Sequence, residues 1–512
     1  MRPRRNTLSP GSGGARGVSP RLTSASAATE GRVSRSERAA GVRGVLSVVI
    51  LLLAFPLRGL DSAPLSHSPE TFRARRERFL SKLPPRSVAV LRSAPERLMS
   101  NDTEYLYRQD SDFFYLTGIE EPDTTAVLRN DPADGKRYIL FVRPRDARRE
   151  AYQGPRPGPA AAAAEYGADA SFAESELANR LASWDPVTYR FSGYLAEAAN
   201  LYLGDGNDAA WAEKFRKALR GVRDRDSGPA AVIDAGELLH EMRLIKDEEE
   251  IRFLRRAAQV SAQGHILAMK AASPGRWEFE VQQALDGSCA ASGARRMAYP
   301  SIVASGPNSV FLHWDKNDRQ IEEGDLVLND SGAEYGYYAT DITRTYPASG
   351  RFSAPQRAVY EVVLEAQRQT LAMVKPGVSH EEIEKKSARV QTEGLVRLGL
   401  LSGDVEKLVE SKAYRKFTVH GISHWVGLDV HDKGSYEVNG ASRRLEPGMV
   451  LTIEPGIYIP ANTAGADPKW WNIGVRIEDT VLVTNEGVEC LSCAAPKEIA
   501  EVEKTVLSGK RR

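Results

Sequence analysis

The chain has 512 residues, 42% hydrophobic and 27% charged, which is ordinary for soluble globular protein and long enough for two or three domains. Its 69 basic and 68 acidic residues nearly cancel, which argues against a broad nucleic-acid-binding face. Three cysteines are too few for a disulfide framework.

The N-terminal stretch differs from the rest. Residues 1–43 contain nine arginines and two acids, and residues 45–57 form an almost unbroken apolar run. That run is short for a membrane span, which needs about 20 residues, but it suits a signal peptide whose small residues Ser62 and Ala63 follow. We expect residues 1–64 to be a targeting or disordered segment, and the protein to be exported or anchored in a membrane by its N-terminus. A transit peptide is an alternative, and the protein is cytoplasmic if the extension is a start-site artefact.

Alternating helix and strand signals follow. Residues 71–80 have a charged helical pattern, and residues 88–91 and 138–142 are apolar runs typical of strands. The alternation continues to about Val232 and predicts a small α/β domain over residues 65–234.

A second domain is expected over residues 235–508. Asp247 with Glu250 three residues later forms a capping box, and the apolar spacing after it predicts a helix to about Ala272. Helices over 354–374 and 379–398 alternate with hairpin-like strands, which indicates an α+β domain.

Four apolar, strand-like runs of this domain each carry a carboxylate, namely Asp330, Asp341, Glu454 and Glu478. An unpaired carboxylate buried in a sheet is very costly, so four of them need a shared cationic partner. Residues 326–330 read as one strand and 337–346 as its antiparallel partner, which brings the two aspartates together. Arg476 shares a strand face with Glu478, where its charge favours ionised carboxylates.

Histidines lie near these acids in sequence. Only eight are present, and three fall within one Gly-containing apolar segment, at positions 420, 424 and 431. We expect one to bind metal and the others to bind substrate or move protons, with His313 a further candidate. Oxygen and imidazole ligands suit Mn²⁺, Co²⁺, Fe²⁺ or Zn²⁺, and a pair of such ions predicts hydrolysis. The other four histidines are read as structural: His67, His240, His265 and His380.

Cys490 and Cys493 have CxxC spacing, but no second CxxC completes a zinc site. We expect them, with Cys289, to be plain thiols in or beside a strand.

Five motifs carry the acids and histidines: Asn329-Asp-Ser-Gly, Thr340-Asp-Ile-Thr-Arg-Thr, His420-Gly-Ile-Ser-His-Trp-Val-Gly-Leu-Asp-Val-His, Glu446-Pro-Gly-Met-Val-Leu-Thr-Ile-Glu-Pro-Gly-Ile-Tyr and Gly474-Val-Arg-Ile-Glu-Asp. Together they resemble the pita-bread metallopeptidases of family M24, in particular the Xaa-Pro aminopeptidases (aminopeptidase P). The resemblance covers about residues 68–506. It implies an RNase H-like α/β aminopeptidase P N-terminal domain followed by an α+β pita-bread catalytic domain.

The resemblance also implies roles for single residues. Asp330 would bind one ion, Asp341 and Glu478 would bridge two, and His424 and Glu454 would complete the second site. Glu454 would also move a proton. His313 and His431 would contact substrate and the tetrahedral intermediate. His420, Arg476 and Tyr458 would line the site, with Arg476 near Asp330.

The implied enzyme is a metal-dependent aminopeptidase that hydrolyses an N-terminal Xaa-Pro bond with a hydroxide bridging two metal ions, usually Mn²⁺. Its substrates would be peptides with proline at position two, and it would form a homodimer or homotetramer. A prolidase, restricted to Xaa-Pro dipeptides, has the same fold and ligands and stays open as an alternative. A metal-free pita-bread protein-binding module is the alternative from another class.

Overall fold

In the computed structural model, residues 65–196, 198–223 and 228–510 are described. Two compact units separate at residue 61, and the architecture below is that of the second unit, residues 62–512. The predicted targeting segment 1–64, with its apolar run 45–57, lies outside the described residues. Across the part that is described, no helix is both long enough and apolar enough to cross a membrane.

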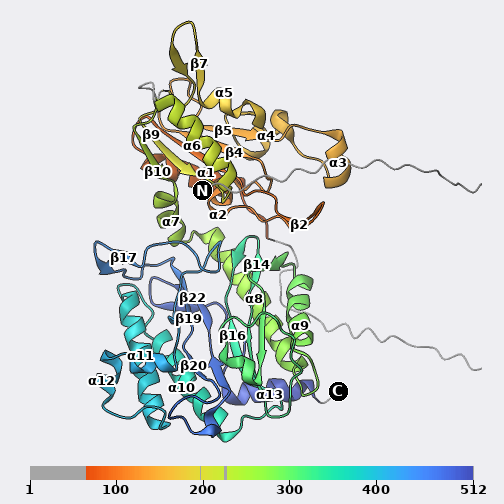
Figure 1. Cartoon of the computed structure of the whole chain (residues 1–512), viewed down its shortest axis with the longest axis vertical. Helices are drawn as coiled ribbons and strands as arrows, with labels where there is room; N and C mark the ends of the chain where they lie inside the picture. Colours follow the sequence, from red (N-terminus) through yellow and green to blue (C-terminus); the bar gives the residue numbers. More distant parts are fainter. Residues whose placement is uncertain (1–64, 197, 224–227, 511–512) are drawn as a thin grey trace, which may run out of the picture. The chain divides into compact units, whose positions relative to one another are not determined.

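A six-stranded mixed sheet forms the centre of the N-terminal domain (Figure 1). Its strand order is β10-β9-β1-β4-β5-β6, in which β1, β9 and β10 run parallel and β4 is antiparallel to both of its neighbours. The strands are β1 Ser87–Arg92, β4 Thr125–Arg129, β5 Tyr138–Val142, β6 Ala170–Ala173, β9 Asn200–Gly204 and β10 Ala231–Asp234. The predicted strands 88–91 and 138–142 are thus confirmed as β1 and β5.

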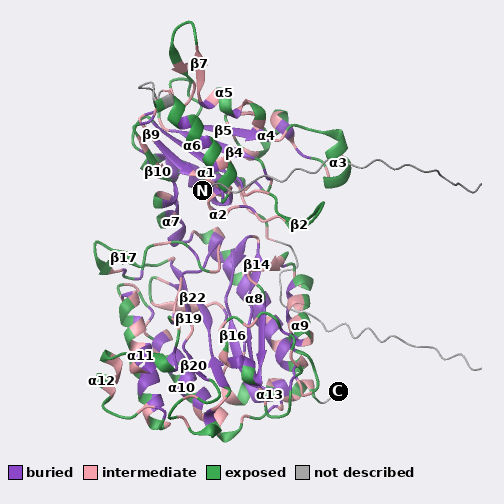
Figure 2. Cartoon of the chain, in the orientation of Figure 1, coloured by how far each residue is buried: buried purple, intermediate pink, exposed green. Residues whose placement is uncertain are grey.

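Both faces of this sheet are covered. Successive side chains of a strand point to opposite faces, so Ala89 and Leu91 of β1 pack in the cluster that holds Phe79 of helix α1, Pro69–Lys82. Val88 and Val90 pack instead with residues of α6, Ala209–Arg223. The central strands β1, β4 and β5 are therefore buried on both sides, and they are purple in Figure 2. The remaining elements of the domain are β2 Leu98–Ser100, β3 Thr103–Glu104, α2 Ser111–Thr117, α3 Ala147–Gln153, α4 Gly158–Tyr166, α5 Leu177–Leu181, β7 Ser183–Asp185 and β8 Arg190–Ser192.

The predicted boundary at residues 234 and 235 falls between β10 and α7, Gly236–Leu244. The helices that follow are α8 Glu248–Ala271, α9 Glu278–Ala291, α10 Ala354–Leu371, α11 His380–Arg397, α12 Val405–Glu410 and α13 Ile499–Gly509. The capping box at the start of α8 is present, with Asp247 accepting from the backbone of Glu250 at 2.9 Å and Glu250 accepting from that of Asp247 at 3.0 Å.

Short antiparallel strands lie between these helices (Figure 1). They are β11 Arg296–Met297, β12 Ile302–Ser305, β13 Leu326–Asp330, β14 Ala333–Tyr335, β15 Tyr338–Ala339, β16 Thr343–Pro347, β17 Glu437–Val438, β18 Ala441–Ser442, β19 Val450–Ile453, β20 Gly456–Ile459, β21 Ile473–Arg476, β22 Asp479–Val483 and β23 Val488–Cys490. The sheets that matter for the site are β12-β13-β16, β19-β22-β23 and β20-β21.

The prediction of one continuous strand over residues 337–346 is wrong. That stretch divides into β15, which pairs with β14, and β16, which pairs with β13 in a different sheet. Between them Asp341 belongs to neither strand, and its backbone N–H donates to the Thr480 hydroxyl at 3.0 Å. The chain leaves one sheet and enters another at this point. The alternation of apolar and polar side chains does not predict such a change of sheet.

The prediction of plain thiols is also wrong for two of the cysteines. Cys490 and Cys493 are joined in a disulfide, while Cys289 is free and buried. CxxC spacing allows such a bond, but sequence spacing alone does not decide whether it forms.

Two glycines in helix interiors make a matched test of packing. A Cβ on Gly394 of α11 would lie 2.2 Å from a methyl carbon of buried Val362 on α10, whereas a Cβ on exposed Gly287 of α9 would meet nothing within 4 Å. We expect Gly394→Ala to lower the free energy of unfolding by about 1–3 kcal/mol through overpacking. Gly287→Ala is expected to raise it by about 0.5–1 kcal/mol through helix propensity. Denaturant unfolding of both variants checks this, and equal effects would contradict the packing.

Candidate metal centre

Strand ends hold three of the five predicted metal ligands. Asp330 is the last residue of β13, Glu454 directly follows β19, and Glu478 directly precedes β22. The antiparallel register of β19 and β22 pairs Ile453 with Asp479. Glu454, which follows Ile453, and Glu478, which precedes Asp479, are therefore brought together.

His424 reaches the same place from the segment before β17. Its backbone N–H donates to the Thr452 hydroxyl at 3.0 Å, and its carbonyl accepts from the Thr452 N–H at 2.9 Å. These two bonds fix the segment along β19. The imidazole Nε2 then lies 3.4 Å from Glu454 and 3.5 Å from Asp341.

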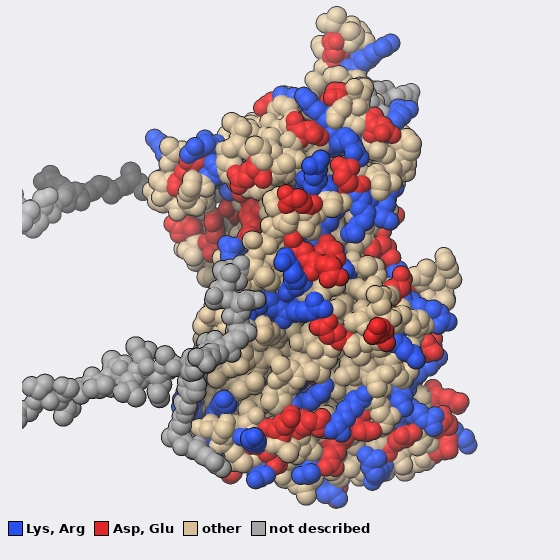
Figure 3. Space-filling view, turned by 180° about the vertical axis from the view of Figure 1, so that it is seen from behind, with Lys and Arg blue, Asp and Glu red and all other residues tan. Residues whose placement is uncertain are grey.

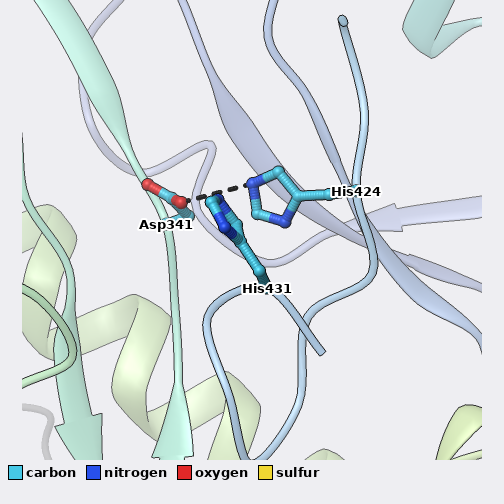
Figure 4. Close-up of side chains that lie close together, drawn as sticks. All are labelled: Asp341, His424 and His431. Atoms are coloured by element: carbon cyan, nitrogen blue, oxygen red, sulfur yellow. Dashed lines mark ion pairs between the residues drawn. The ribbon is translucent and has the colours of Figure 1, made fainter. Parts of the chain in front are cut away.

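The five side chains form overlapping groups of donors. One oxygen each from Asp330, Asp341 and Glu478 lies within 4.8 Å of the others, and so do donors from His424, Glu454 and Glu478. Glu478 belongs to both groups. A third such group adds His431, whose ring centroid is 4.2 Å from that of His424. Figure 4 shows His424 directed at Asp341, with His431 beside them.

Electrostatics in this cluster fit a bound cation. Burial, with the charges of Asp341 and Glu454, raises the pKa of Glu478 well above its usual value. Burial likewise raises the pKa of Asp330 to about 6 and that of Glu454 to about 7. Arg476 lowers the pKa of Asp330, as we expected, but burial raises it by more. The guanidinium therefore favours the ionised carboxylate without restoring its usual pKa.

His424 is the exception in this environment. Burial disfavours its charged form, yet its hydrogen bond to Asp341 and the charge of Glu454 raise the pKa of His424 to about 9. Burial acts to raise the pKa of Asp341, but His424 outweighs it and lowers that pKa. The imidazolium thus occupies the electrostatic role that a divalent cation would take over.

A direct indication of a missing partner is Glu478 Oε1, a buried oxygen with no hydrogen-bond partner among the described residues. Such atoms are rare in native interiors. Four carboxylates and one imidazole form a mainly hard donor set, which suits divalent ions such as Mn²⁺. The residues present therefore fit a divalent metal centre.

Neutral and cationic donors fix the ligand oxygens. Arg476 donates to Asp330 Oδ2 at 2.5 Å and to the Tyr458 hydroxyl at 2.8 Å, and the Thr343 hydroxyl donates to Glu478 Oε2 at 2.6 Å. The hydroxyl of Tyr299 lies within hydrogen-bond distance of both Asp330 and Asp341 and can donate to one at a time. Sequence reasoning missed Tyr299, because it lies outside any strand and no pattern marks it.

The predicted substrate-contacting residues differ in exposure. His431 and His313 are exposed. Partial burial has the largest effect on the pKa of His431 and lowers it, and the nearby His424 and His313 lower it further. His420 is half-buried, with Nε2 2.8 Å from the Tyr458 hydroxyl and Nδ1 3.5 Å from Glu454. Burial and then Arg476 lower the pKa of His420 to about 3.

The four histidines that we predicted to be structural make their hydrogen bonds outside the donor cluster. His265 and His67 lie 2.9 Å from the backbone carbonyls of Ser331 and Gly336. His240 lies 3.0 Å from Asp112, and His380 lies 3.3 Å from the Ser423 carbonyl. None of the four belongs to a donor group among the described residues.

Arg243 of α7 holds the segment that carries His431. Its guanidinium donates to Asp429 at 2.7 Å and to buried Asp432, and the Lys246 ammonium donates to Asp432 at 2.9 Å. The same guanidinium donates to Asp112 of the N-terminal domain at 2.8 Å. Burial acts against the charge of Arg243, but these carboxylates raise its pKa well above the usual value.

Comparisons with known proteins give the fold and site a family. The model of "Metallopeptidase family M24" matches residues 252–485, and that of "Aminopeptidase P, N-terminal domain" matches residues 72–185. The Xaa-Pro aminopeptidase of Escherichia coli is 40% identical over 87% of this chain and 99% of its own length.

Two solved structures are similar as well. Pseudomonas aeruginosa aminopeptidase PepP matches with a TM-score of 0.82 at 40% identity, over 87% of this chain and 99% of that one. Zn-substituted aminopeptidase P from E. coli, in complex with product, matches with a TM-score of 0.82 at 38% identity, over 88% and 100%.

This chain belongs to metallopeptidase family M24 and carries its pita-bread catalytic domain. Within that family it is an aminopeptidase P, an enzyme of the peptidase class, because the aminopeptidase P N-terminal domain precedes the catalytic domain and the similarity extends over both. The predicted fold class is confirmed.

Tyr299 and Tyr346 make a matched pair for testing the centre. The Tyr299 hydroxyl serves Asp330 and Asp341, whereas the buried Tyr346 hydroxyl has no partner among the described residues. We expect Tyr299→Phe to weaken Mn²⁺ affinity roughly tenfold, the usual effect of losing a donor to a metal ligand. Tyr346→Phe should leave it unchanged. Competition with a fluorescent chelator measures both, and equal affinities would refute the positioning role of Tyr299.

Proposed function

We propose that this enzyme removes the first residue from peptides that have proline at position two, with two divalent ions bound at the cluster. The observation that carries the proposal is the pair of donor groups that share Glu478. Asp330, Asp341 and Glu478 would hold one ion, and Asp341, His424, Glu454 and Glu478 the other. The name of the E. coli relative, 40% identical over nearly its whole length, supports the substrate class.

Mn²⁺ is the ion we propose, with Co²⁺, Zn²⁺ or Fe²⁺ as alternatives, because the donors are mainly oxygen. When bound, such ions supply Lewis-acid activation of a water molecule and of the scissile carbonyl. The protein supplies the buried carboxylates that would hold such ions.

Glu454 is the proposed proton carrier. Its carboxylate would take a proton from the attacking water and return it to the proline nitrogen that leaves. The Thr452 hydroxyl, 3.3 Å from Glu454 Oε1, orients the carboxylate. An Xaa-Pro bond has no N–H, so the leaving nitrogen must receive its proton from such a group.

Exposed His431 and His313 are the proposed contacts to the substrate carbonyl and to the oxyanion that develops on it. His420 and Tyr458, joined at 2.8 Å, would form the wall beside Glu454. Arg476 is 3% exposed and its donors reach Asp330, Tyr458 and Thr343, so its proposed role is to position these groups.

The proposed partners are peptides and further copies of the same chain, as a homodimer or homotetramer. On the face shown in Figure 3, acidic and basic side chains are mixed. A protein that binds nucleic acid through this face would gather basic residues there, so the mixture supports a function without nucleic acid.

The full chain loaded with Mn²⁺ should release only the first residue from an Xaa-Pro-Yaa-Zaa tetrapeptide, measured by mass spectrometry of the products. A chelator should abolish the reaction. Glu454→Gln should lower kcat by about 10²–10⁴-fold, the usual worth of a general acid–base group. Glu446→Gln, an exposed residue just before β19, is the matched control and should retain activity.

Other outcomes assign other functions. Cleavage of an Xaa-Pro dipeptide but not of the tetrapeptide would identify a prolidase. Protein that binds no divalent metal at all would instead be a metal-free binding module. Two bound ions without cleavage of either peptide would refute the substrate class.

We also propose that the protein is exported or anchored by its N-terminus. The support is the basic stretch followed by the apolar run 45–57. In a bacterial host the full chain should fractionate with membrane or periplasm, and deletion of residues 45–57 should leave it in the cytosol. Immunoblots of the fractions measure this, and a cytosolic full chain would refute the proposal.

A further inference from the structure

The disulfide between Cys490 and Cys493 closes a very short loop at the end of β23, with a sequence separation of 3. Cys493 is exposed and Cys490 is half-buried. A bond across so few residues constrains the unfolded chain less than a long-range bond does, so the fold depends on it little. Its position and chemistry therefore need another explanation.

A cation lies beside the exposed sulfur. The Lys497 ammonium is 3.3 Å from Cys493 Sγ and 2.6 Å from Asp479 Oδ2. A lysine next to a cysteine of a CxxC pair favours the thiolate, the form that attacks and leaves in thiol–disulfide exchange. An accessible sulfur beside a cation is the arrangement that favours exchange.

The loop between the two sulfurs carries a buried hydroxyl toward the metal centre. Ser492 donates to Asp479 Oδ1 at 2.7 Å and accepts from the Thr480 N–H at 3.0 Å. The Leu491 N–H donates to the Thr480 carbonyl at 3.0 Å. Closing the disulfide thus fixes a hydroxyl that is hydrogen-bonded to the first two residues of β22.

Those two residues connect directly to predicted metal ligands. The Thr480 hydroxyl donates to the Asp341 carbonyl at 2.8 Å and accepts from the Asp341 N–H at 3.0 Å. Asp479 follows Glu478 and accepts from Arg344 at 2.6 Å, and the same guanidinium donates to the Glu478 carbonyl. Both ligands that would bridge the ions are therefore held by groups in contact with the disulfide loop.

We propose that Cys490 and Cys493 form a reversible redox site that controls metal affinity: the closed disulfide holds the ligands in place, and reduction by a dithiol loosens them. The regulatory part rests on the proposed function, because it concerns the same metal centre. The redox site itself stands on the loop geometry alone.

A thiolate of the dithiol reductant attacks exposed Cys493 Sγ, the bond between the two chain sulfurs breaks, and Cys490 leaves as a thiolate that takes up one proton. This leaves a mixed disulfide between one reductant sulfur and Cys493. The second thiolate of the reductant attacks that reductant sulfur and releases Cys493 as a thiolate beside Lys497. The reductant becomes a disulfide and the chain gains two electrons, while the second reductant proton passes to solvent.

A metal ion bound between Asp479 and the two sulfurs is the competing reading, since their donor atoms lie within 4.8 Å of one another. Asp479 already accepts from Arg344, Lys497, Gln367 and Ser492. With its oxygens committed to these donors, including two cations, it is a poor third ligand, and the disulfide is favoured.

The first experiment is a redox titration of the native full chain. It would be equilibrated with mixed reduced and oxidised dithiothreitol, quenched with acid and alkylated, and its labels counted by intact mass, where Cys289 adds one constant label. We expect the pair to equilibrate with the dithiol without unfolding. Binding and reduction are linked reciprocally, so saturating Mn²⁺ should shift the midpoint about fivefold or more toward the disulfide.

The second experiment measures Mn²⁺ affinity directly by competition with a fluorescent chelator. Reduction should weaken it by the same factor, about fivefold or more. Cys490→Ser/Cys493→Ser should show the reduced value and no response to the dithiol, which controls for chelation by the reagent. Ser492→Ala should weaken affinity with the disulfide intact, whereas exposed Ser508→Ala should not.

Every other outcome overturns the proposal. A pair that resists reduction in the native state is a structural bond, and a pair that reduces with no change in Mn²⁺ affinity does not act on the metal centre. One extra Mn²⁺ or Zn²⁺ bound only after reduction would assign the competing metal site. Neither experiment uses peptide, so these results are independent of whether Xaa-Pro substrates are cleaved.

Discussion

The cost of gathering like charges out of water governs the structure of this enzyme. Four carboxylates meet at one place in the pita-bread domain, all of them mostly or wholly removed from solvent. Neither Arg476 nor His424 offsets the full charge, since the pKa values of three of the four acids stay raised. Divalent ions complete the balance, and buried hydrogen bonds from Tyr299, Thr343 and Arg476 hold the ligand oxygens in position.

The short sheets meet this demand through their registers. Pairing of Asp330 with Thr343 and of Ile453 with Asp479 places acids from different strands at a common end. A slip of one residue in either pair would turn a ligand to the opposite face of its sheet. The threonines beside the ligands, at positions 343, 452 and 480, add hydroxyl bonds that make such a slip costlier.

How much of this the sequence predicts depends on whether the signal is local. The capping box of α8 and the strand ends at Asp330, Glu454 and Glu478 follow from residues a few positions apart. Asp341 is different, because its place depends on a chain that changes sheets and on a bond to Thr480, 139 positions away. The role of Tyr299 depends likewise on contacts 31 and 42 positions distant.

The disulfide is a third kind of case. The spacing of Cys490 and Cys493 is plain in the sequence, and so is nearby Lys497. The link to the metal centre depends on the hydrogen bond between Ser492 and Asp479, which the pairing of β22 with β23 brings together. Fold class was predictable because many weak local signals agree. Fine structure around the ligands was not, because single long-range contacts decide it.

One guanidinium joins the two domains chemically. Arg243 is buried and shares its donors among Asp112 in the first domain and Asp429 and Asp432 in the second. A gene that exchanged its first domain for one lacking an acid at that position would leave Arg243 with unpaired, buried N–H groups beside the segment of His431. The two domains are therefore expected to be inherited as a pair.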